Sequence, residues 1–342
     1  MTGTVSDDLL AATLGVDEIA MLRGSLRAVL QESTSTDTLI ASLAELGWDD
    51  VVAESPEAIA LLFEEQGRSG ASSGLLDRVV LNAAGLGALD GAAVLYALPG
   101  PGRLFQPAAG IVGRHLTATG TLRSAADQSA PSLIVVPVLM DGATSLVSIP
   151  GGLLEPIPVN GLDPAGNWMR VAITVPPESV NFLDVSRPEW IEAVAAGRRA
   201  LSAELIGLAQ RALDVAVETA TDRHQFGRAV GSFQAVRFRL AEAKVAIESA
   251  SELLRLAFRD PDPLVAATAK AMAGSAADVA VRQAMQVCGA MGLTWEFPLH
   301  PIFRRVTVLD GLLGGTEGLT TAIGHHVATA SELPQLEPFG TH

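Results

Sequence analysis

The spacing of apolar residues divides the chain into a helical first part, a strand-rich middle and a helical last part. Up to about residue 95, apolar residues recur three and four positions apart, as at Leu22 and Leu26, which predicts short helices. Thr36 or Asp37 is expected to cap one of these helices, because both side chains can accept a hydrogen bond from a first-turn N–H group.

The middle of the chain has a different pattern. A breaker cluster, Leu98-Pro-Gly-Pro-Gly-Arg103, precedes short segments that are rich in β-branched residues and bounded by Gly, Pro, Asp and Asn. Such segments predict the strands of a small antiparallel β domain. They cover residues 132–140, 144–149 and 168–175.

Beyond Pro188 the apolar spacing is helical almost to the end, over residues 190–222, 233–258, 264–291 and 316–330. The third stretch is apolar almost all round, which is typical of a buried helix, and four such helices predict an antiparallel bundle. The expected fold class is α+β, mainly α. Its parts are an N-terminal helical domain (1–95), a reduced β domain (96–187) and a C-terminal four-helix bundle (188–335).

Composition narrows the classes of function. Of 342 residues, 49% are hydrophobic and only 18% are charged, so some apolar helix faces are expected to be covered by partner subunits. The net charge of −15 argues against binding nucleic acid. A single cysteine, Cys288, excludes an internal disulfide and favours a reducing compartment. We see neither a signal peptide nor an uninterrupted apolar run of about 18 residues, so no membrane span and a cytoplasmic location are expected.

The segment between the first two long helices carries the first candidate binding residues, Arg223, Gln225 and Phe226. One interpretation is a helix-hairpin turn, in which Gly227 caps the helix and Arg223 offsets its negative end. The other is a surface for a phosphate-linked ring system. The planar guanidinium of Arg223 can donate two hydrogen bonds to a pyrophosphate, and Phe226 offers a face for a flat ring.

Two glycine-rich segments further along have the same double interpretation. Gln286, Gly289 and Gly292 form a helix exit that is either a plain stop or a place where backbone N–H groups approach a phosphate. Gly315 and Thr316 form either an ordinary N-cap or an anion seat at a helix N-terminus.

Taken together, these segments resemble the acyl-CoA dehydrogenase family. The motifs are Arg223-His-Gln-Phe-Gly, Gln286-x-x-Gly-Ala-x-Gly and Leu313-Gly-Gly-Thr, with Leu43-Ala-Glu-Leu-Gly-Trp and Glu64-Glu-Gln-Gly-Arg in the first domain. The resemblance implies the three-domain fold and the cofactor FAD. It also implies that the bundle motifs hold the ADP half of a flavin whose reactive ring lies in a neighbouring subunit.

The same resemblance shows what this sequence lacks. Family members remove a proton α to a thioester with a carboxylate while the flavin accepts a hydride. The two positions at which the family carries that carboxylate correspond to Gly314 and Gly197. Glu204, seven residues after Gly197, is the candidate replacement, although a helix-packing ion pair is the favoured interpretation of it. Glu317 and Glu192 are expected to be a first-turn acid and a surface residue.

The resemblance therefore implies a subunit that depends on a partner. It is similar to the smaller chains of heteromeric (α2β2) dehydrogenases of steroid-degrading bacteria, in which a homologous chain supplies the base and the substrate is a steroid side-chain acyl-CoA. An electron-transferring flavoprotein is the expected electron acceptor. We find no flavin-ring motifs between Tyr96 and Val180, and we expect His300, His325 and His326 to be structural rather than metal ligands. Two alternatives stay open: a self-sufficient homomeric dehydrogenase that uses Glu204, and a structural bundle protein without flavin.

Overall fold

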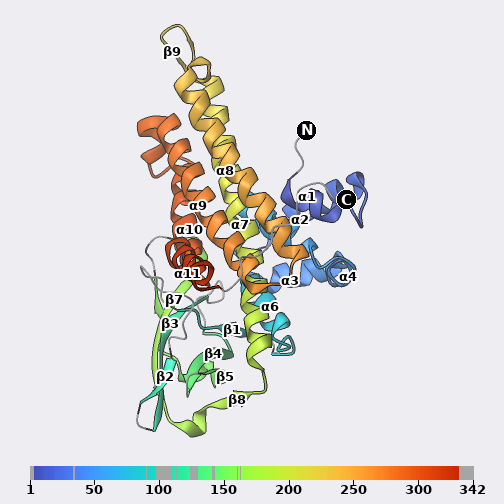
Figure 1. Cartoon of the computed structure of the whole chain (residues 1–342), viewed down its shortest axis with the longest axis vertical. Coiled ribbons are helices and arrows are strands. Elements are labelled where there is room, and N and C mark those ends of the chain that lie inside the picture. The colour runs from blue at the N-terminus through green and yellow to red at the C-terminus, as the bar shows by residue number, and fades with distance from the viewer. Residues whose placement is uncertain are drawn as a thin grey trace.

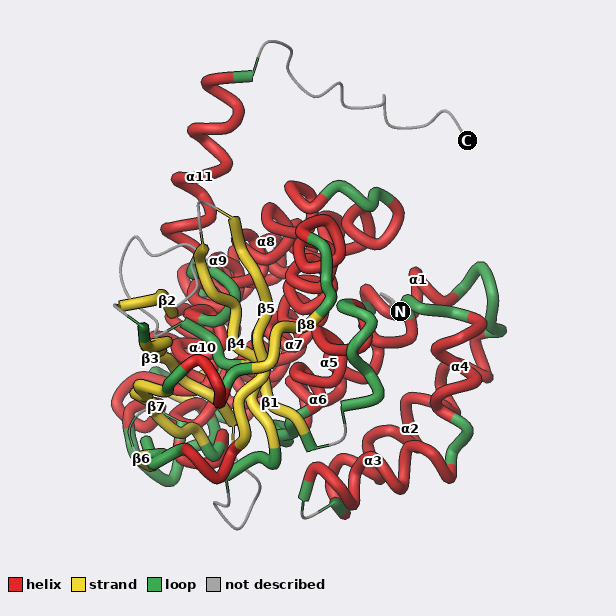
Figure 2. Tube along the Cα trace, turned by 90° about the horizontal axis from the view of Figure 1, so that it is seen from below, coloured by secondary structure: helices red, strands yellow, loops and turns green. Residues whose placement is uncertain are grey.

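The computed structural model describes residues 4–33, 35–89, 91–97, 109–112, 114–123, 130–140, 143–159, 161 and 163–330. Long helices form a tall bundle, with a sheet at its lower end and short N-terminal helices at its side (Figure 1). Seen from below, the sheet and helices α1–α4 lie on opposite sides of α5, α6 and α7 (Figure 2). The breaker cluster predicted at residues 98–103 lies outside the described residues.

The N-terminal part is helical, as predicted. Its helices are α1 (Val5–Leu10), α2 (Val16–Glu32), α3 (Thr36–Glu45), α4 (Trp48–Glu54), α5 (Ala58–Ser69) and α6 (Leu75–Ala83). The predicted cap of α3 is wrong by one residue, because the hydroxyl of Ser35 accepts the hydrogen bond from the N–H of Thr38 at 3.1 Å. The helical part also ends earlier than residue 95, since the first strand begins at Ala92.

Helix α5 joins this region to the bundle through direct backbone contact with α7. A Cβ atom on Gly67 would lie only 2.2 Å from the carbonyl oxygen of Glu204, and one on Gly207 would lie 2.2 Å from that of Glu64. No side chain larger than hydrogen fits at such distances. The two glycines therefore set how closely α5 and α7 approach.

The middle of the chain forms one sheet. Its strands are β1 (Ala92–Val94), β2 (Ala109–Val112), β3 (His115–Arg123), β4 (Leu133–Met140), β5 (Ala143–Pro150), β6 (Ile157–Pro158), β7 (Trp168–Val175) and β8 (Asn181–Leu183). Three short 3-10 turns, η1 (Gly151–Leu153), η2 (Pro164–Gly166) and η3 (Pro177–Ser179), join them. The strand order is β6-β7-β3-β2-β4-β5-β8, with β1 also paired to β4.

The three predicted strands are present as β4, β5 and β7, but the prediction of a purely antiparallel sheet is wrong. Strands β1 and β2 both pair with β4 in parallel, whereas the other pairs in the sheet are antiparallel. Strand β3, which lies between β2 and β7, was not predicted, because its threonines and Gly120 give no continuous apolar run. The result is a mixed sheet with an apolar core of its own.

The C-terminal part consists of α7 (Arg187–Asp222), α8 (Gln234–Arg259), α9 (Pro263–Cys288), α10 (Leu299–Gly311) and α11 (Thr316–Thr329). Between them lie β9 (His224–Gln225), β10 (Arg228–Ala229), η4 (Val230–Ser232) and η5 (Gly289–Leu293). Helices α7, α8 and α9 pack on one another, α10 packs on α7 and α9, and α11 lies against α9. The bundle was predicted, but α10 was not, because Pro301 in its first turn resembles a breaker.

Helix α9 is the buried apolar helix that the sequence predicts. Within the described residues, Pro263–Leu293 is the one helical stretch that is long and apolar enough to cross a membrane, and 61% of its most apolar window is buried inside the protein. Small side chains, mainly alanine, let it pack tightly against α7 and α8. Burial of this extent is what a core helix of a bundle shows.

Candidate functional site

Helix α7 ends in a short hairpin at the far end of the bundle (Figure 1). Strands β9 and β10 pair across a two-residue turn, Phe226-Gly227, in which both residues have positive φ (54° and 78°). Gly227 is therefore a hairpin residue and not the helix cap that one sequence interpretation assumed. The C-cap is Arg223, whose N–H donates to the carbonyl of Thr219 at 3.0 Å. The ring of Phe226 is 92% exposed.

Arg223 brings the first two motifs together. Its guanidinium donates a hydrogen bond to the carbonyl oxygen of Cys288 at 3.2 Å, at the end of α9. Gly289 comes next in the chain, and a Cβ atom there would lie 3.9 Å from the same guanidinium. Gln286 is exposed one turn earlier and lines an open groove together with Gly289. Gly292 is buried against Cys288 and Met285 and ends the segment.

We name the end of the bundle around this hairpin the arginine tip. Its arginines share one property, which is that none forms an ion pair with a carboxylate of the described residues. They are Arg223, Arg228, Arg237 and Arg239. Arg228 lies over the ring of Phe233, with 4.1 Å between the guanidinium carbon and the ring centre. Guanidinium groups without a carboxylate partner can attract an anion such as phosphate, even in a chain of net charge −15.

Sequence reasoning found Arg223 but missed the other three arginines of the tip. A signal was available, because Arg228 follows the motif directly and Arg237 and Arg239 lie in the first two turns of the next helix.

Gly315 and Thr316 lie elsewhere. Gly315 is the N-cap of α11, and Thr316 is its first residue rather than the cap. The hydroxyl of Thr316 donates a hydrogen bond to Oδ1 of Asp310 at 2.6 Å, and the N–H of Thr316 donates one to Oδ2 at 3.2 Å. This helix start packs beside Gly274 of α9. Cys288 is about four turns further along α9, on the order of 20 Å away. The structure therefore separates Gly315 and Thr316 from the arginine tip.

A buried lysine holds the loop before α11 in place. Lys270 is fully buried, and its Nζ donates to the carbonyl oxygen of Gly314 at 2.8 Å and contacts the carboxylate of Asp310 at 3.3 Å. Burial lowers the pKa of Lys270 to about 8, although the nearby Asp310 carboxylate opposes the shift. These contacts fix the backbone of Gly314, one of the two positions at which the family places its base.

Both of those positions are closed by apolar side chains. A Cβ atom on Gly197 would lie 2.5 Å from Cδ1 of Leu313 and 2.8 Å from Cγ2 of Val80. One on Gly314 would lie 2.8 Å from Cδ2 of Leu319, and Gly314 has a φ of 103°, which side chains rarely adopt. A carboxylate side chain at either position would have to displace these apolar groups. Apolar packing fills the space that a base would need.

Glu204 is buried and has a partner. Its Oε1 accepts a hydrogen bond from Nε of Arg305 at 3.1 Å and a second from the same guanidinium, which joins α7 to α10. The side chains are only 3% and 4% exposed. This geometry matches the packing interpretation of Glu204 rather than that of a base.

The sequence analysis did not identify a group of buried charges near Glu204. Burial and the nearby Arg305 together lower the pKa of Arg123 to about 10, while Glu204 and Asp163 oppose the shift. Burial also raises the pKa of Asp77 to about 6, although its carboxylate accepts a hydrogen bond from the hydroxyl of Tyr96 at 2.5 Å. These groups connect α6, the sheet and the bundle.

The remaining candidates occupy ordinary structural positions. Glu317 is an exposed first-turn acid of α11, and Glu192 forms an ion pair with Arg199. The ring of His300 lies against Trp295, with 4.6 Å between ring centres. His325 and His326 are exposed, and Cys288 is buried beside Thr219. Among the described residues, no group of three or more His, Cys, Asp or Glu could hold a metal ion.

The fold is that of the acyl-CoA dehydrogenases. A Tcur3481-Tcur3483 steroid dehydrogenase variant superimposes with a TM-score of 0.74 at 22% identity, over 91% of this chain and 98% of that one. The ChsE4-ChsE5 complex of Mycobacterium tuberculosis gives a TM-score of 0.71 at 21% identity, over 97% and 99%. At these identities the structural likeness concerns the fold alone.

Sequence comparison finds the same family over the C-terminal part of the chain. Residues 190–328 match the family model of the acyl-CoA dehydrogenase C-terminal domain. The acyl-CoA dehydrogenase IpdE2 of Mycobacterium tuberculosis is 42% identical over 105 residues, which are 31% of this chain and 33% of the relative. The alignment thus spans about a third of that protein's length. Members of the family depend on FAD.

Proposed function

We propose that this chain is the non-catalytic-type subunit of a heteromeric, FAD-dependent acyl-CoA dehydrogenase. Its arginine tip contacts the adenylate end of FAD, and a homologous partner chain supplies the catalytic base and most of the flavin-ring pocket. The observation that carries this proposal is a contrast within one chain. The tip has an assembled, unpaired set of arginines, whereas Gly197 and Gly314 are packed against apolar side chains.

The residues present fit one end of FAD and not the other. Arg223 can donate paired hydrogen bonds to a pyrophosphate, and the exposed Phe226 offers an aromatic face. Bound FAD supplies the acceptor for a hydride, and this chain contributes binding and orientation at the phosphate end. A base is a separate requirement, because α-proton removal needs a carboxylate within hydrogen-bond reach of the substrate. Leu313 occupies that space here.

The finer parts of the proposal concern assembly and substrate. We propose a heterotetramer (α2β2). The assembly of two different chains is in line with the two structural relatives, the ChsE4-ChsE5 complex and the Tcur3481-Tcur3483 steroid ACAD. The proposed substrate is the CoA thioester of a steroid side chain, in lipid metabolism. We further propose a cytoplasmic location and an electron-transferring flavoprotein as electron acceptor.

The alternative of a self-sufficient enzyme that uses Glu204 has less support. Glu204 is buried between α7 and α10 and holds Arg305, so it has no free path to a thioester. A structural bundle without flavin would have no need for a cluster of unpaired arginines around an exposed aromatic ring. Neither alternative accounts for the tip and the closed base positions together.

The test is co-expression with a longer homologue that carries the family's glutamate. We expect the purified complex to be yellow and to oxidise an acyl-CoA, and this chain alone to be colourless and inactive. Arg223→Gln should lower the FAD content of the complex, since a charge-assisted pair contributes roughly 1.5–3 kcal/mol. Arg259→Gln, an exposed arginine at the other end of α8, is the matched control and should retain its flavin.

Subunit association must be measured in the same samples, by light scattering after gel filtration. Loss of flavin with the complex intact supports a direct contact between Arg223 and the cofactor. A single chain that is yellow and oxidises an acyl-CoA by itself would overturn the proposal.

A further inference from the structure

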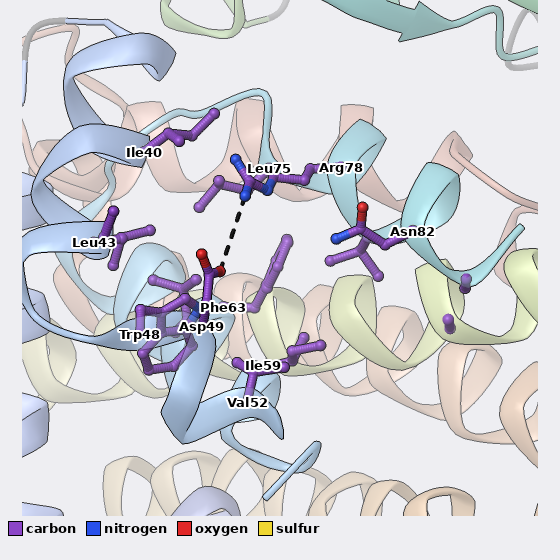
Figure 3. Close-up of a pocket in the computed structure, with 15 residues that line it drawn as sticks. Ile40, Leu43, Trp48, Asp49, Val52, Ile59, Phe63, Leu75, Arg78 and Asn82 are labelled. Carbon is purple, nitrogen blue, oxygen red and sulfur yellow. Dashed lines mark ion pairs between the residues drawn. The ribbon is translucent and has the colours of Figure 1, made fainter. Parts of the chain in front are cut away.

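An apolar cavity lies inside the N-terminal helical region, away from the arginine tip. It has a volume of about 280 Å³ and is lined by side chains of α3, α4, α5 and α6 (Figure 3) and by Ala196 of α7. Its walls are almost entirely hydrophobic. The main contributors are Ile40, Leu43, Trp48, Val52, Phe63 and Val79.

Three polar side chains line this cavity. Arg78 and Asn82 come from α6, and Asp49 comes from α4 (Figure 3). Arg78 and Asp49 form a long ion pair of 3.9 Å (dashed in Figure 3), which is too long for a hydrogen bond, and their side chains are 43% and 75% exposed. The guanidinium of Arg78 has no hydrogen bond to the residues that the structure describes. Because the ion pair with Asp49 is long and exposed, the N–H groups of Arg78 can still donate hydrogen bonds to a ligand in the cavity.

The cavity is separate from the closed base positions. Helix α6 presents Leu76 and Val80 to Gly197, whereas Leu75 and Val79, each one position away, line the cavity. A shift of one residue turns a helix face by about 100°. A ligand in the cavity would therefore contact a different face of α6 from the one that packs on Gly197.

We propose that this cavity binds a monocarboxylic acid with an apolar body, whose carboxylate meets Arg78. At ~30 Å³ for each water-sized group, the volume admits on the order of nine heavy atoms. A body of that size is a medium-length alkyl chain. The planar fork of an arginine matches a carboxylate in two parallel hydrogen bonds. Asp49 does not close the site, because it is mostly exposed and its contact with Arg78 is long.

Binding can be followed through Trp48, which is 7% exposed and is the one tryptophan among the residues lining the cavity. We would titrate the full chain with decanoate and with 10-bromodecanoate, whose bromine quenches a neighbouring indole. Quenching is expected in the wild-type protein and not in Trp48→Phe. This experiment needs neither the partner chain nor FAD, so its outcome is independent of the proposed function.

The head group is tested by variants and by matched ligands. Arg78→Gln should weaken decanoate binding by roughly tenfold or more, as expected for loss of a charge-assisted hydrogen bond, and should leave 1-decanol unchanged. Arg259→Gln, on an exposed surface of the bundle, should change neither. Val79→Trp should fill the cavity and abolish the binding of both ligands.

Three outcomes would overturn the proposal. One is the absence of Trp48 quenching by 10-bromodecanoate. Another is equal affinity for decanoate and 1-decanol in both the wild-type protein and Arg78→Gln, which would show an apolar site without head-group recognition. The third is preferential binding of decylamine that is lost in Asp49→Asn, since it would assign the head group to Asp49 instead.

Discussion

The Glu204–Arg305 pair allows a direct test of whether Glu204 is structural or catalytic. Glu204→Gln keeps the shape of the side chain and removes its charge. Arg305, only 4% exposed, would then lose its anionic partner inside the protein. The fully buried Arg123 would also lose one of the negative charges that favour its charged form. The substitution should therefore destabilise the fold well before it affects any chemistry.

The size of the effect follows from the burial of both side chains. Removing one partner of a buried ion pair typically costs about 3–5 kcal/mol, because the other charge stays buried and unpaired. Total stability of a domain is of the order of 5–15 kcal/mol. Glu204→Gln should therefore lower the free energy of unfolding by a large fraction. Glu204→Leu combined with Arg305→Met should restore most of it, since neither charge is then left alone.

Urea unfolding followed by circular dichroism measures these differences. Glu317→Gln, at an exposed position of α11, is the control and should stay within about 0.5 kcal/mol of wild type. Turnover of the complex with the partner chain should be measured per folded molecule and should be nearly unchanged in Glu204→Gln. Wild-type stability together with a loss of turnover of a hundredfold or more would refute the reasoning and make Glu204 the base.

Further predictions concern other buried positions. Burial raises the pKa of Asp77 to about 6 from 3.8, so its contribution to stability is present below pH ~4 and is lost as the pH rises through ~6. The free energy of unfolding of Asp77→Asn, relative to that of the wild type, should therefore rise by on the order of 3 kcal/mol between pH 4 and pH 7. Urea unfolding measures this difference, and a difference that does not depend on pH would contradict the prediction. Gly314→Glu should lower the melting temperature and give no acyl-CoA oxidation by this chain alone, because the backbone at Gly314 has a positive φ and its Cβ would meet Leu319. Measurable turnover would show that the space can open. Gly67→Ala should cost about 1–3 kcal/mol by forcing its Cβ against the carbonyl of Glu204, whereas Gly24→Ala, with open space around it, should be neutral or slightly stabilising in the same thermal melts.

Much of the fold could be predicted from the sequence where a strong period lasts long enough. The long helices α7, α8 and α9 and strands β4, β5 and β7 agree with their predicted ranges to within a few residues. Helix α10 was missed because Pro301 resembles a helix breaker. It lies in the first turn of the helix, where proline is tolerated. The parallel pairing of β1 and β2 with β4 depends on contacts between distant segments, which local patterns do not specify.

The candidate site was predictable in its residues but not in its arrangement. The motif placed Arg223 and Phe226 in one turn, and the structure adds the contact of Arg223 with the end of α9. The distance of Gly315 from that point depends on the length and direction of α10, which was not predicted. The sequence showed glycine at 197, but only packing shows that Leu313 fills the adjoining space.

The location of the arginine tip has a consequence for how such a chain can evolve after gene duplication. The tip lies at the outer end of the bundle (Figure 1), and Gly197, one of the closed base positions, lies about seven helical turns away from it along α7. Mutations that fill the interior therefore leave the geometry of the outer end unchanged. One copy can lose its own catalytic residues by successive mutations and still be kept by selection, because the partner chain needs from it only the residues at the outer end of the bundle.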